Sequence, residues 1–154
     1  GLGDIIGIFQ GGWEYRVKAG SPFVGETKEM VIDHPYKIAT ISFGDMPTET
    51  IIKNAQWKQR INTIGNECFN RFVKNPTVTN FVKEANNFSV RTQLITKEIK
   101  NFYKKHQNAP FLYSQIMLGN GIFLLYNKDD DLTEIEEKVN KEILCKKTVK
   151  KIDS

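Results

Sequence analysis

Three short segments of the chain carry residue types that bind or activate small molecules. The first is Asp4, which follows Gly1-Leu2-Gly3 and precedes an apolar stretch. A carboxylate next to a glycine turn can act as a general base or as a metal ligand. Because Asp is also a favoured N-cap, Asp4 could instead cap a helix that begins at Ile5. The spacing leaves both interpretations open.

The second segment contains Arg16, which comes soon after Gly11-Gly12 in a strand-like run. A guanidinium binds a carboxylate or a phosphate in a bidentate manner, which suits a substrate-binding role. The alternation of a strand would point Arg16 away from the side that carries Tyr15 and Val17. A solvent-exposed arginine would give the same pattern, so this pattern also has two interpretations.

The third segment consists of Gly119, Asn120 and Gly121, which separate two apolar runs. Glycine lets the backbone approach a ligand closely, as a phosphate cradle requires. However, Asn-Gly is also the strongest short signal for a β-hairpin turn. The local sequence therefore allows either a cradle or a plain turn.

The composition excludes several classes of protein. The 154 residues, 40% hydrophobic and 26% charged, fit one ordinary globular domain. The net charge is +4, but the lysines are scattered, so we expect no nucleic-acid surface. No apolar run reaches eighteen residues, so we expect no membrane span. Neither His34 nor His106 has paired cysteines or carboxylates around it, so we expect no metal site. Cys68 and Cys145 lie in apolar contexts and suggest buried free thiols in a reducing cytoplasm.

Periodicity predicts the elements that must position these residues. Alternation predicts strands at 13–18 and 36–43, and a continuous apolar run predicts a buried strand at 122–126. Short strands are also expected at 29–32 and 147–152, the last at a sheet edge. Helical spacing predicts helices from 49 to 74, from 78 in a long region up to 106, and from 132. Thr48, Thr77 and Asp131 are suitable N-caps. This order predicts an α+β fold, with helices on one face of a mostly antiparallel sheet.

The order of four segments resembles the GHMP small-molecule kinases, and most closely the archaeal pantoate kinases among them. The segments are Gly1-Leu2-Gly3-Asp4 with Gly11-Gly12 and Arg16, Gly44-Asp45-Met46-Pro47-Thr48, Ile61-Asn62-Thr63-Ile64-Gly65 leading to Asn75-Pro76-Thr77, and Met117-Leu118-Gly119-Asn120. The resemblance covers most of the chain and corresponds to the C-terminal portion of these kinases. Residues 1–30 would be the end of the N-terminal kinase lobe with the active-site acid, and residues 31–154 the C-terminal domain.

The resemblance implies a function and a set of roles. The function would be ATP-dependent phosphorylation of (R)-pantoate to 4-phosphopantoate in coenzyme A biosynthesis. Asp4 would act as the general base or orient the acceptor hydroxyl, Arg16 would hold the substrate carboxylate, and Thr48 would contact a substrate polar group. Gly119, Asn120 and Gly121 would fall in the glycine-rich motif that buttresses the phosphate loop.

The resemblance also implies parts that the 154 residues do not hold. GHMP kinases bind ATP on a Gly/Ser-rich loop at a helix N-terminus, together with Mg²⁺ on an acidic residue. We therefore expect the chain to be inactive without an N-terminal kinase lobe. Another GHMP kinase with a mevalonate-type or homoserine-type acceptor is one alternative, and a non-catalytic ligand-binding or regulatory module is another. A cytoplasmic location and a homodimer complete the expectations.

Overall fold

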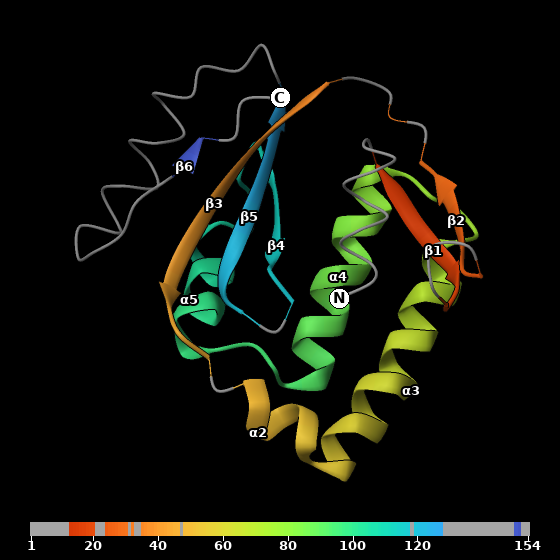
Figure 1. Cartoon of the computed structure of the whole chain (residues 1–154). Coiled ribbons are helices and arrows are strands. Elements are labelled where there is room, and N and C mark those ends of the chain that lie inside the picture. The colour runs from red at the N-terminus through yellow and green to blue at the C-terminus, as the bar shows by residue number, and fades with distance from the viewer. Residues whose placement is uncertain are drawn as a thin grey trace.

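A computed structural model of the chain shows helices packed around a central sheet, with a small second sheet beside the helices (Figure 1). The structure describes residues 13–20, 24–30, 32, 35–46, 48–117, 119–127 and 150–151. Asp4, the short helix expected after it, and the helix expected after Asp131 therefore lie outside the described residues. His34 and Cys145 lie outside them as well.

The central sheet has four antiparallel strands in the order β4-β5-β3-β6. Its middle strands are β3 (Tyr36–Gly44) and β5 (Asn120–Asn127), and both match predicted strands. The outer strands are β4 (Leu112–Gln115) and β6 (Lys150–Lys151). Strand β6 lies at the sheet edge, as predicted for the lysine-rich C-terminal segment.

The second sheet is a pair of antiparallel strands, β1 (Glu14–Lys18) and β2 (Glu26–Glu29). Strand β1 matches the prediction, whereas β2 begins three residues before the expected strand at 29–32. An isolated pair of strands is marginally stable in water and needs packing against another element. Here Tyr15 of β1 meets the ring of Phe72 edge-on, with ring centroids 5.2 Å apart. Aromatic packing against a helix thus holds the small sheet in place.

Two helices follow β3, namely α2 (Thr48–Lys53) and α3 (Ala55–Phe72). Helix α2 begins one residue earlier than predicted. Asn54 interrupts the predicted helix, because its side chain accepts hydrogen bonds from the backbone N–H groups of Gln56 at 2.9 Å and Trp57 at 3.1 Å. These two groups have no partner within the helix, so the asparagine starts a new helix.

The long helical region predicted up to residue 106 is two helices, α4 (Val78–Thr92) and α5 (Lys97–Lys105). Thr77 caps α4, as predicted. Gln93 ends it with a φ of 62°, a left-handed conformation that cannot continue a right-handed helix. Thr96 then caps α5. The break is a real change of chain direction and separates the faces that the two helices cover.

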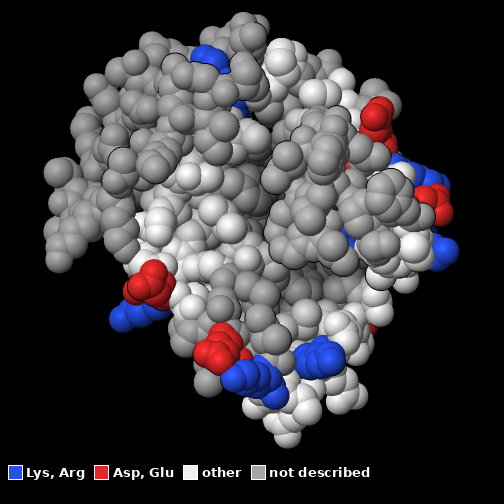
Figure 2. Space-filling view, viewed as in Figure 1, with Lys and Arg blue, Asp and Glu red and all other residues white. Residues whose placement is uncertain are grey.

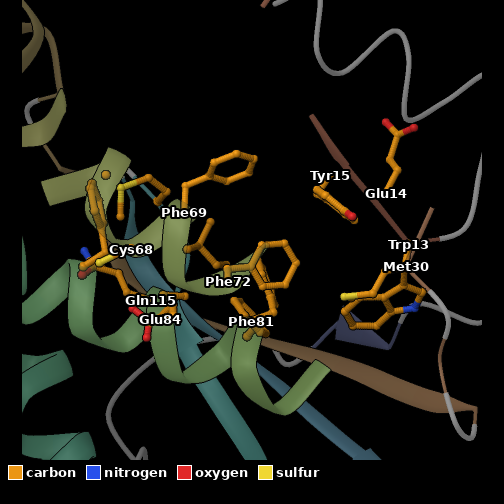
Figure 3. A pocket seen from close by; sticks show the side chains of 16 residues that line it. Trp13, Glu14, Tyr15, Met30, Cys68, Phe69, Phe72, Phe81, Glu84 and Gln115 are labelled. Carbon is orange, nitrogen blue, oxygen red and sulfur yellow. The ribbon is translucent and has the colours of Figure 1, made fainter. Parts of the chain in front are cut away.

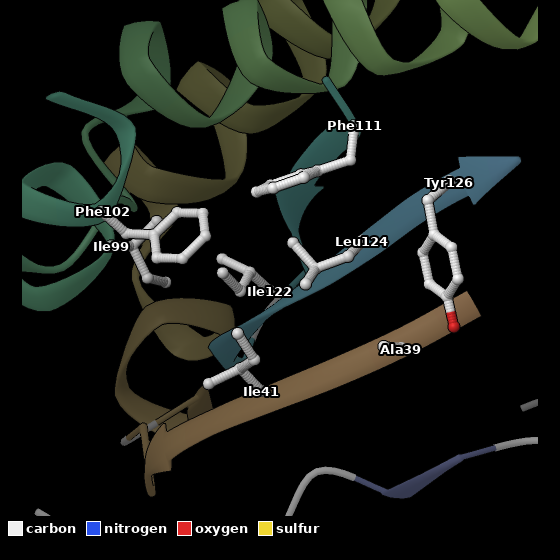
Figure 4. Packing of buried hydrophobic residues seen from close by; sticks show 8 residues of the cluster. All are labelled: Ala39, Ile41, Ile99, Phe102, Phe111, Ile122, Leu124 and Tyr126. Carbon is white, nitrogen blue, oxygen red and sulfur yellow. The ribbon is translucent and has the colours of Figure 1, made fainter. Parts of the chain in front are cut away.

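Helices cover both faces of the central sheet, which differs from the prediction of helices on one face. On one face, strand residues pack with Ile99 and Phe102 of α5 (Figure 4); these are Ala39, Ile41, Ile122, Leu124 and Tyr126. On the other face, Ile38, Phe123 and Leu125 pack with residues of α3 and α4, namely Phe72, Val78 and Val82. Successive strand residues point to opposite faces, and both sets are apolar, so each face needs a cover. The α+β class and the antiparallel sheet are confirmed.

The surface carries charges of both signs. In Figure 2, described Lys and Arg side chains lie next to acidic ones and do not form a continuous basic patch on the face shown. Within the described part of the chain, no helix has both the length and the apolar character that crossing a membrane requires.

Candidate functional site

A pocket of about 500 Å³ lies between α3, α4, β1 and the turn that joins β4 to β5 (Figure 3). Its size falls within the range of small-molecule sites. The walls are mainly apolar, and most are aromatic rings or long aliphatic chains; they include Trp13, Tyr15, Met30, Phe69, Phe72, Phe81, Phe88, Ile116, Met117 and Phe123.

The apolar stripes of two helices face this pocket. Cys68 and Phe72 come from the stripe of α3, and Phe81, Ala85 and Phe88 come from that of α4. Residues three and four apart share one face of a helix, which is why each stripe forms a wall. The two stripes do not fill the space between the helices, so residues of both stripes line a cavity.

An ion pair sits at the helical side of the pocket. Glu84 lines the pocket and is 6% exposed. Its Oε2 accepts a hydrogen bond from Nε of Arg71 at 2.9 Å and lies 2.8 Å from Nη2 of Arg71 in an ion pair. The hydrogen bond from Arg71 lowers the pKa of Glu84 despite the opposing effect of burial. Glu84 is therefore ionised and already neutralised, so it is poorly suited to act as a general base near neutral pH.

The thiol of Cys68 belongs to the same cluster. Nη2 of Arg71 lies 3.1 Å from Cys68 Sγ. Burial raises the pKa of Cys68, although the nearby Arg71 works against that increase. The thiolate is the reactive form of cysteine, so a raised pKa makes Cys68 a weak nucleophile. The structure thus agrees with the expected buried free thiol at this position.

The pocket suits an apolar group better than an anion. None of the described residues that line it is basic, while Glu14 and Glu84 are acidic. A triphosphate or a free carboxylate would meet no cation there and would lose its hydration. The pocket can therefore hold an apolar group, but its described residues offer no charge stabilisation for phosphoryl transfer.

The structure does not bring Arg16 and Thr48 together. Arg16 lies in the middle of β1, opposite Thr27 of β2. The neighbouring Tyr15 packs on the last turns of α3, whereas Thr48 begins α2, the short helix that precedes α3 (Figure 1). At 1.5 Å per residue, the 18 residues of α3 span about 27 Å.

The predicted glycine segment lies where the hairpin turn meets the next strand: Gly119 ends the turn, and Asn120 and Gly121 begin β5. The N–H of Gly119 donates to the carbonyl of Ile116 at 3.0 Å, and the N–H of Ile116 donates to the carbonyl of Gly121 at 2.9 Å. The N–H of Gly119 is thus occupied and not free for a phosphate. A Cβ on Gly121 would lie 2.8 Å from the carbonyl oxygen of Ile41, so glycine lets β5 approach β3 closely. Asn120 accepts a hydrogen bond from the hydroxyl of Thr96 at 2.8 Å.

No metal site emerges from the part of the chain that the structure describes, where no three His, Cys, Asp or Glu side chains gather. His106 caps the end of α5 and stacks on Phe102, with ring centroids 4.1 Å apart. Sequence reasoning missed the break before α5, although Thr96 followed by Glu98 is an ordinary start signal for a helix. It also missed Gln115, whose buried amide gives no signal in the sequence.

Two known proteins that are similar to this chain in sequence are both pantoate kinases. The chain is 36% identical over 131 residues to the pantoate kinase of Methanocaldococcus jannaschii. The matched region covers 84% of this chain and 47% of that protein. It is 29% identical over 131 residues to the pantoate kinase of Thermococcus kodakarensis, covering 84% of this chain and 43% of that protein. No protein-family model matches the sequence.

The fold comparison agrees with the sequence comparison. A solved structure described as a phosphotransferase related to the CoA biosynthesis pathway superposes with a TM-score of 0.71 and 21% identity, covering 90% of this chain and 44% of that one. At that identity the match establishes a shared fold. The predicted resemblance to archaeal pantoate kinases is thus confirmed, and the chain spans about half the length of the pantoate kinases that it matches.

Proposed function

We propose that the chain is the C-terminal part of an ATP-dependent pantoate kinase that phosphorylates a hydroxyl group of pantoate for coenzyme A biosynthesis. The observation that carries the proposal is the 36% identity to a pantoate kinase across 84% of the chain. The shared fold with a CoA-related phosphotransferase supports it. Both matches cover less than half of the longer proteins, which fits a kinase whose N-terminal lobe is missing from these residues.

In this proposal Asp4 orients or deprotonates the acceptor hydroxyl, and Arg16 binds the pantoate carboxylate. Arg16 is favoured over Thr48 for the carboxylate because only a guanidinium gives a charged, bidentate contact. Arg16 lies in β1, which packs on the last turns of α3, whereas Thr48 lies in the helix that precedes α3. The proposed contact of Thr48 with substrate therefore needs a separate test. Residues 1–30 would form the end of the N-terminal lobe, and residues 31–154 would form the C-terminal domain.

ATP and Mg²⁺ would be held mainly by the N-terminal lobe. The described residues fit neither, because the pocket lacks basic side chains and the turn at Gly119 uses its N–H internally. In this proposal, Gly119, Asn120 and Gly121 would contact the N-terminal lobe that holds ATP. No direct contact between the described residues and ATP is proposed. The chain without the lobe is expected to be inactive, because phosphoryl transfer depends on positioning and charge stabilisation.

The first test is a mass measurement of the intact protein, followed by an ATP-dependent phosphorylation assay with pantoate, mevalonate and homoserine. We expect a mass well above 17.7 kDa and turnover of pantoate. Asp4→Asn should lower kcat by about 100-fold or more, as loss of a general base does. The matched control is Asp45→Asn, which changes an exposed carboxyl group in the β3–α2 turn. Near-normal turnover in Asp4→Asn would contradict the assigned role.

Arg16→Ala should raise KM for pantoate by about tenfold with a smaller change in KM for ATP. Lys18→Ala is the control, because Lys18 is an exposed cation on the same strand. If both variants behave alike, Arg16 has no specific contact with the acceptor. Phosphorylation of mevalonate or homoserine in preference to pantoate would move the chain to another class of acceptor.

A further inference from the structure

The turn between β4 and β5 is tied to a distant part of the chain by the side chain of Gln115. Gln115 is 3% exposed at the end of β4. Its Nε2 donates to the carbonyl of Leu94 at 3.2 Å and to that of Gly119 at 3.1 Å. One amide group therefore joins the turn to the segment 93–96, which connects α4 to α5.

A second tie joins the same two segments. The hydroxyl of Thr96 donates to Oδ1 of Asn120 at 2.8 Å, and it also accepts the N–H of Ile99 at 3.4 Å as the cap of α5. The segment 93–96 thus holds the turn at Gly119 and again at Asn120. Because α4 ends and α5 begins in this segment, both helices resist a shift of the turn.

The donor side of the Gln115 amide explains why a polar residue occupies this position. Both hydrogens of Nε2 point to backbone carbonyls, while Oε1 is sealed and has no hydrogen-bond partner among the described residues. A buried polar atom without a partner is unfavourable, and an apolar side chain would avoid that penalty. The benefit at this position is therefore the cross-link that the two donated bonds make.

The cross-link fixes a turn whose tip faces outward. Ile116 and Met117 are 40% and 43% exposed, and both border the pocket. Apolar side chains exposed on a tightly held turn present a surface of fixed shape. A firmly tied turn suits the support of a neighbouring lobe better than a flexible one.

We propose that Gln115 is a positioning residue: it holds the β4–β5 turn in the shape that supports the nucleotide-binding lobe of the kinase. This inference rests on the proposed function. Gln115 would touch neither ATP nor pantoate, and it would act only through the turn. Its loss should therefore affect the use of ATP more than the binding of the acceptor.

The first experiment measures hydrogen exchange in the intact protein and in Gln115→Met, a variant of similar side-chain length without the donor. The readouts are the amide protons of Ile116 and Gly119, which bond to the carbonyls of Gly121 and Ile116. Their protection should fall by about tenfold beyond any change in global stability. The control Leu124→Val truncates a residue that is 2% exposed in the same hairpin but leaves the tie intact. Equal exchange in Gln115→Met and wild type would overturn the proposal.

The second experiment measures kinetics on the same proteins. Gln115→Met should raise KM for ATP by about fivefold or more and leave KM for pantoate within about twofold. Leu124→Val should change neither constant. A KM for ATP that stays unchanged, or an equal rise in both constants, would refute the positioning role even if the turn opens.

A further pair of variants keeps the proposal testable if Gln115→Met does not fold. Thr96→Val removes the second tie, and Thr96→Ser keeps the hydroxyl and should restore the wild-type KM for ATP. A rise in Thr96→Ser equal to that in Thr96→Val would count against the tie. If the wild-type protein phosphorylates no substrate, the proposed function fails and the positioning role fails with it. The exchange of Ile116 and Gly119 would still show separately whether Gln115 holds the turn.

Discussion

Replacing Tyr103 by Phe should expose how the outer edge of the central sheet is protected. Among the described strands, none lies beyond β4 in the sheet, so the outward backbone groups of β4 need other partners. Nδ2 of Asn86 donates to the carbonyl of Tyr113 at 2.9 Å. The hydroxyl of Tyr103 donates to Oδ1 of Asn86 at 2.6 Å and accepts the N–H of Gln115 at 2.9 Å. One phenol oxygen thus closes the network along the strand edge.

The size of the effect follows from the bonds that disappear. Tyr103→Phe removes the donor to Asn86 and the acceptor for Gln115 without creating a large cavity. Each lost hydrogen bond is worth about 1 kcal/mol, and a buried group left unpaired adds about 1 kcal/mol or more. We therefore expect the free energy of unfolding to fall by about 2–3 kcal/mol. For a protein of this length, that corresponds to a decrease in Tm of about 5–10 °C.

Urea unfolding followed by tryptophan fluorescence measures this change, with an unchanged m-value as the test that the native and unfolded states are comparable. Tyr113→Phe is the matched control, because it removes the same atom but only a hydrogen bond of 3.3 Å to the carbonyl of Tyr103. Asn86→Ala combined with Tyr103→Phe should show a coupling energy of about 1 kcal/mol. A cost below about 0.5 kcal/mol, or one no larger than that of Tyr113→Phe, would refute the proposed edge network.

Three further predictions concern pH and two glycines with different surroundings. Because Arg71 holds the pKa of Glu84 below its ordinary value of 4.5, the stability from this pair is present above pH 4.5 and is lost as the pH falls through the lowered pKa. In Glu84→Gln, the free energy of unfolding should therefore fall less steeply with decreasing pH in the acid range, and an unchanged slope would contradict this. Burial raises the pKa of Tyr103 above its ordinary value of 10.0, so its contribution persists below pH 10.0 and is lost as the pH rises through the raised pKa; titration of tyrosinate absorbance in wild type and Tyr103→Phe checks it. Gly121→Ala would place a Cβ 2.8 Å from a backbone carbonyl and should destabilise the protein by about 1–3 kcal/mol. In Gly65→Ala, the new Cβ would lie 3.4 Å from a ring atom within a helix, so this variant should be neutral or stabilising by up to about 1 kcal/mol. Equal Tm values for the two variants would show that the close approach of the strands does not matter.

The elements that depend on neighbouring residues could be predicted from the sequence. The alternation in 36–43 and the continuous apolar run in 122–126 predicted both central strands, since a strand that is covered on both faces is apolar throughout. Thr77 gave the start of α4, because a threonine can bond a free N–H of the first helical turn on its own. The resemblance to pantoate kinases was also visible at this level, in the order of a few short segments.

Predictions that depended on distant contacts could not be settled in this way. The break at Gln93 was missed, because a left-handed residue other than glycine leaves little trace in the sequence and its surroundings must hold it. A pocket lies between the apolar stripes of two helices, because the spacing of the helices is set by the whole fold. Arg16 and Thr48 were assigned to one substrate, yet a helix of 18 residues separates their positions.

The sequence by itself therefore determined the local elements, the α+β class and the relation to a family of kinases. Each of these rests on interactions between residues close together in the chain, or on the order of short motifs. Only the tertiary structure decided that helices cover both faces of the sheet, that a pocket opens beside β1, and that Gln115 ties the turn to the segment between α4 and α5. Those features are sums of contacts between residues far apart in sequence, and they form only when the chain has folded.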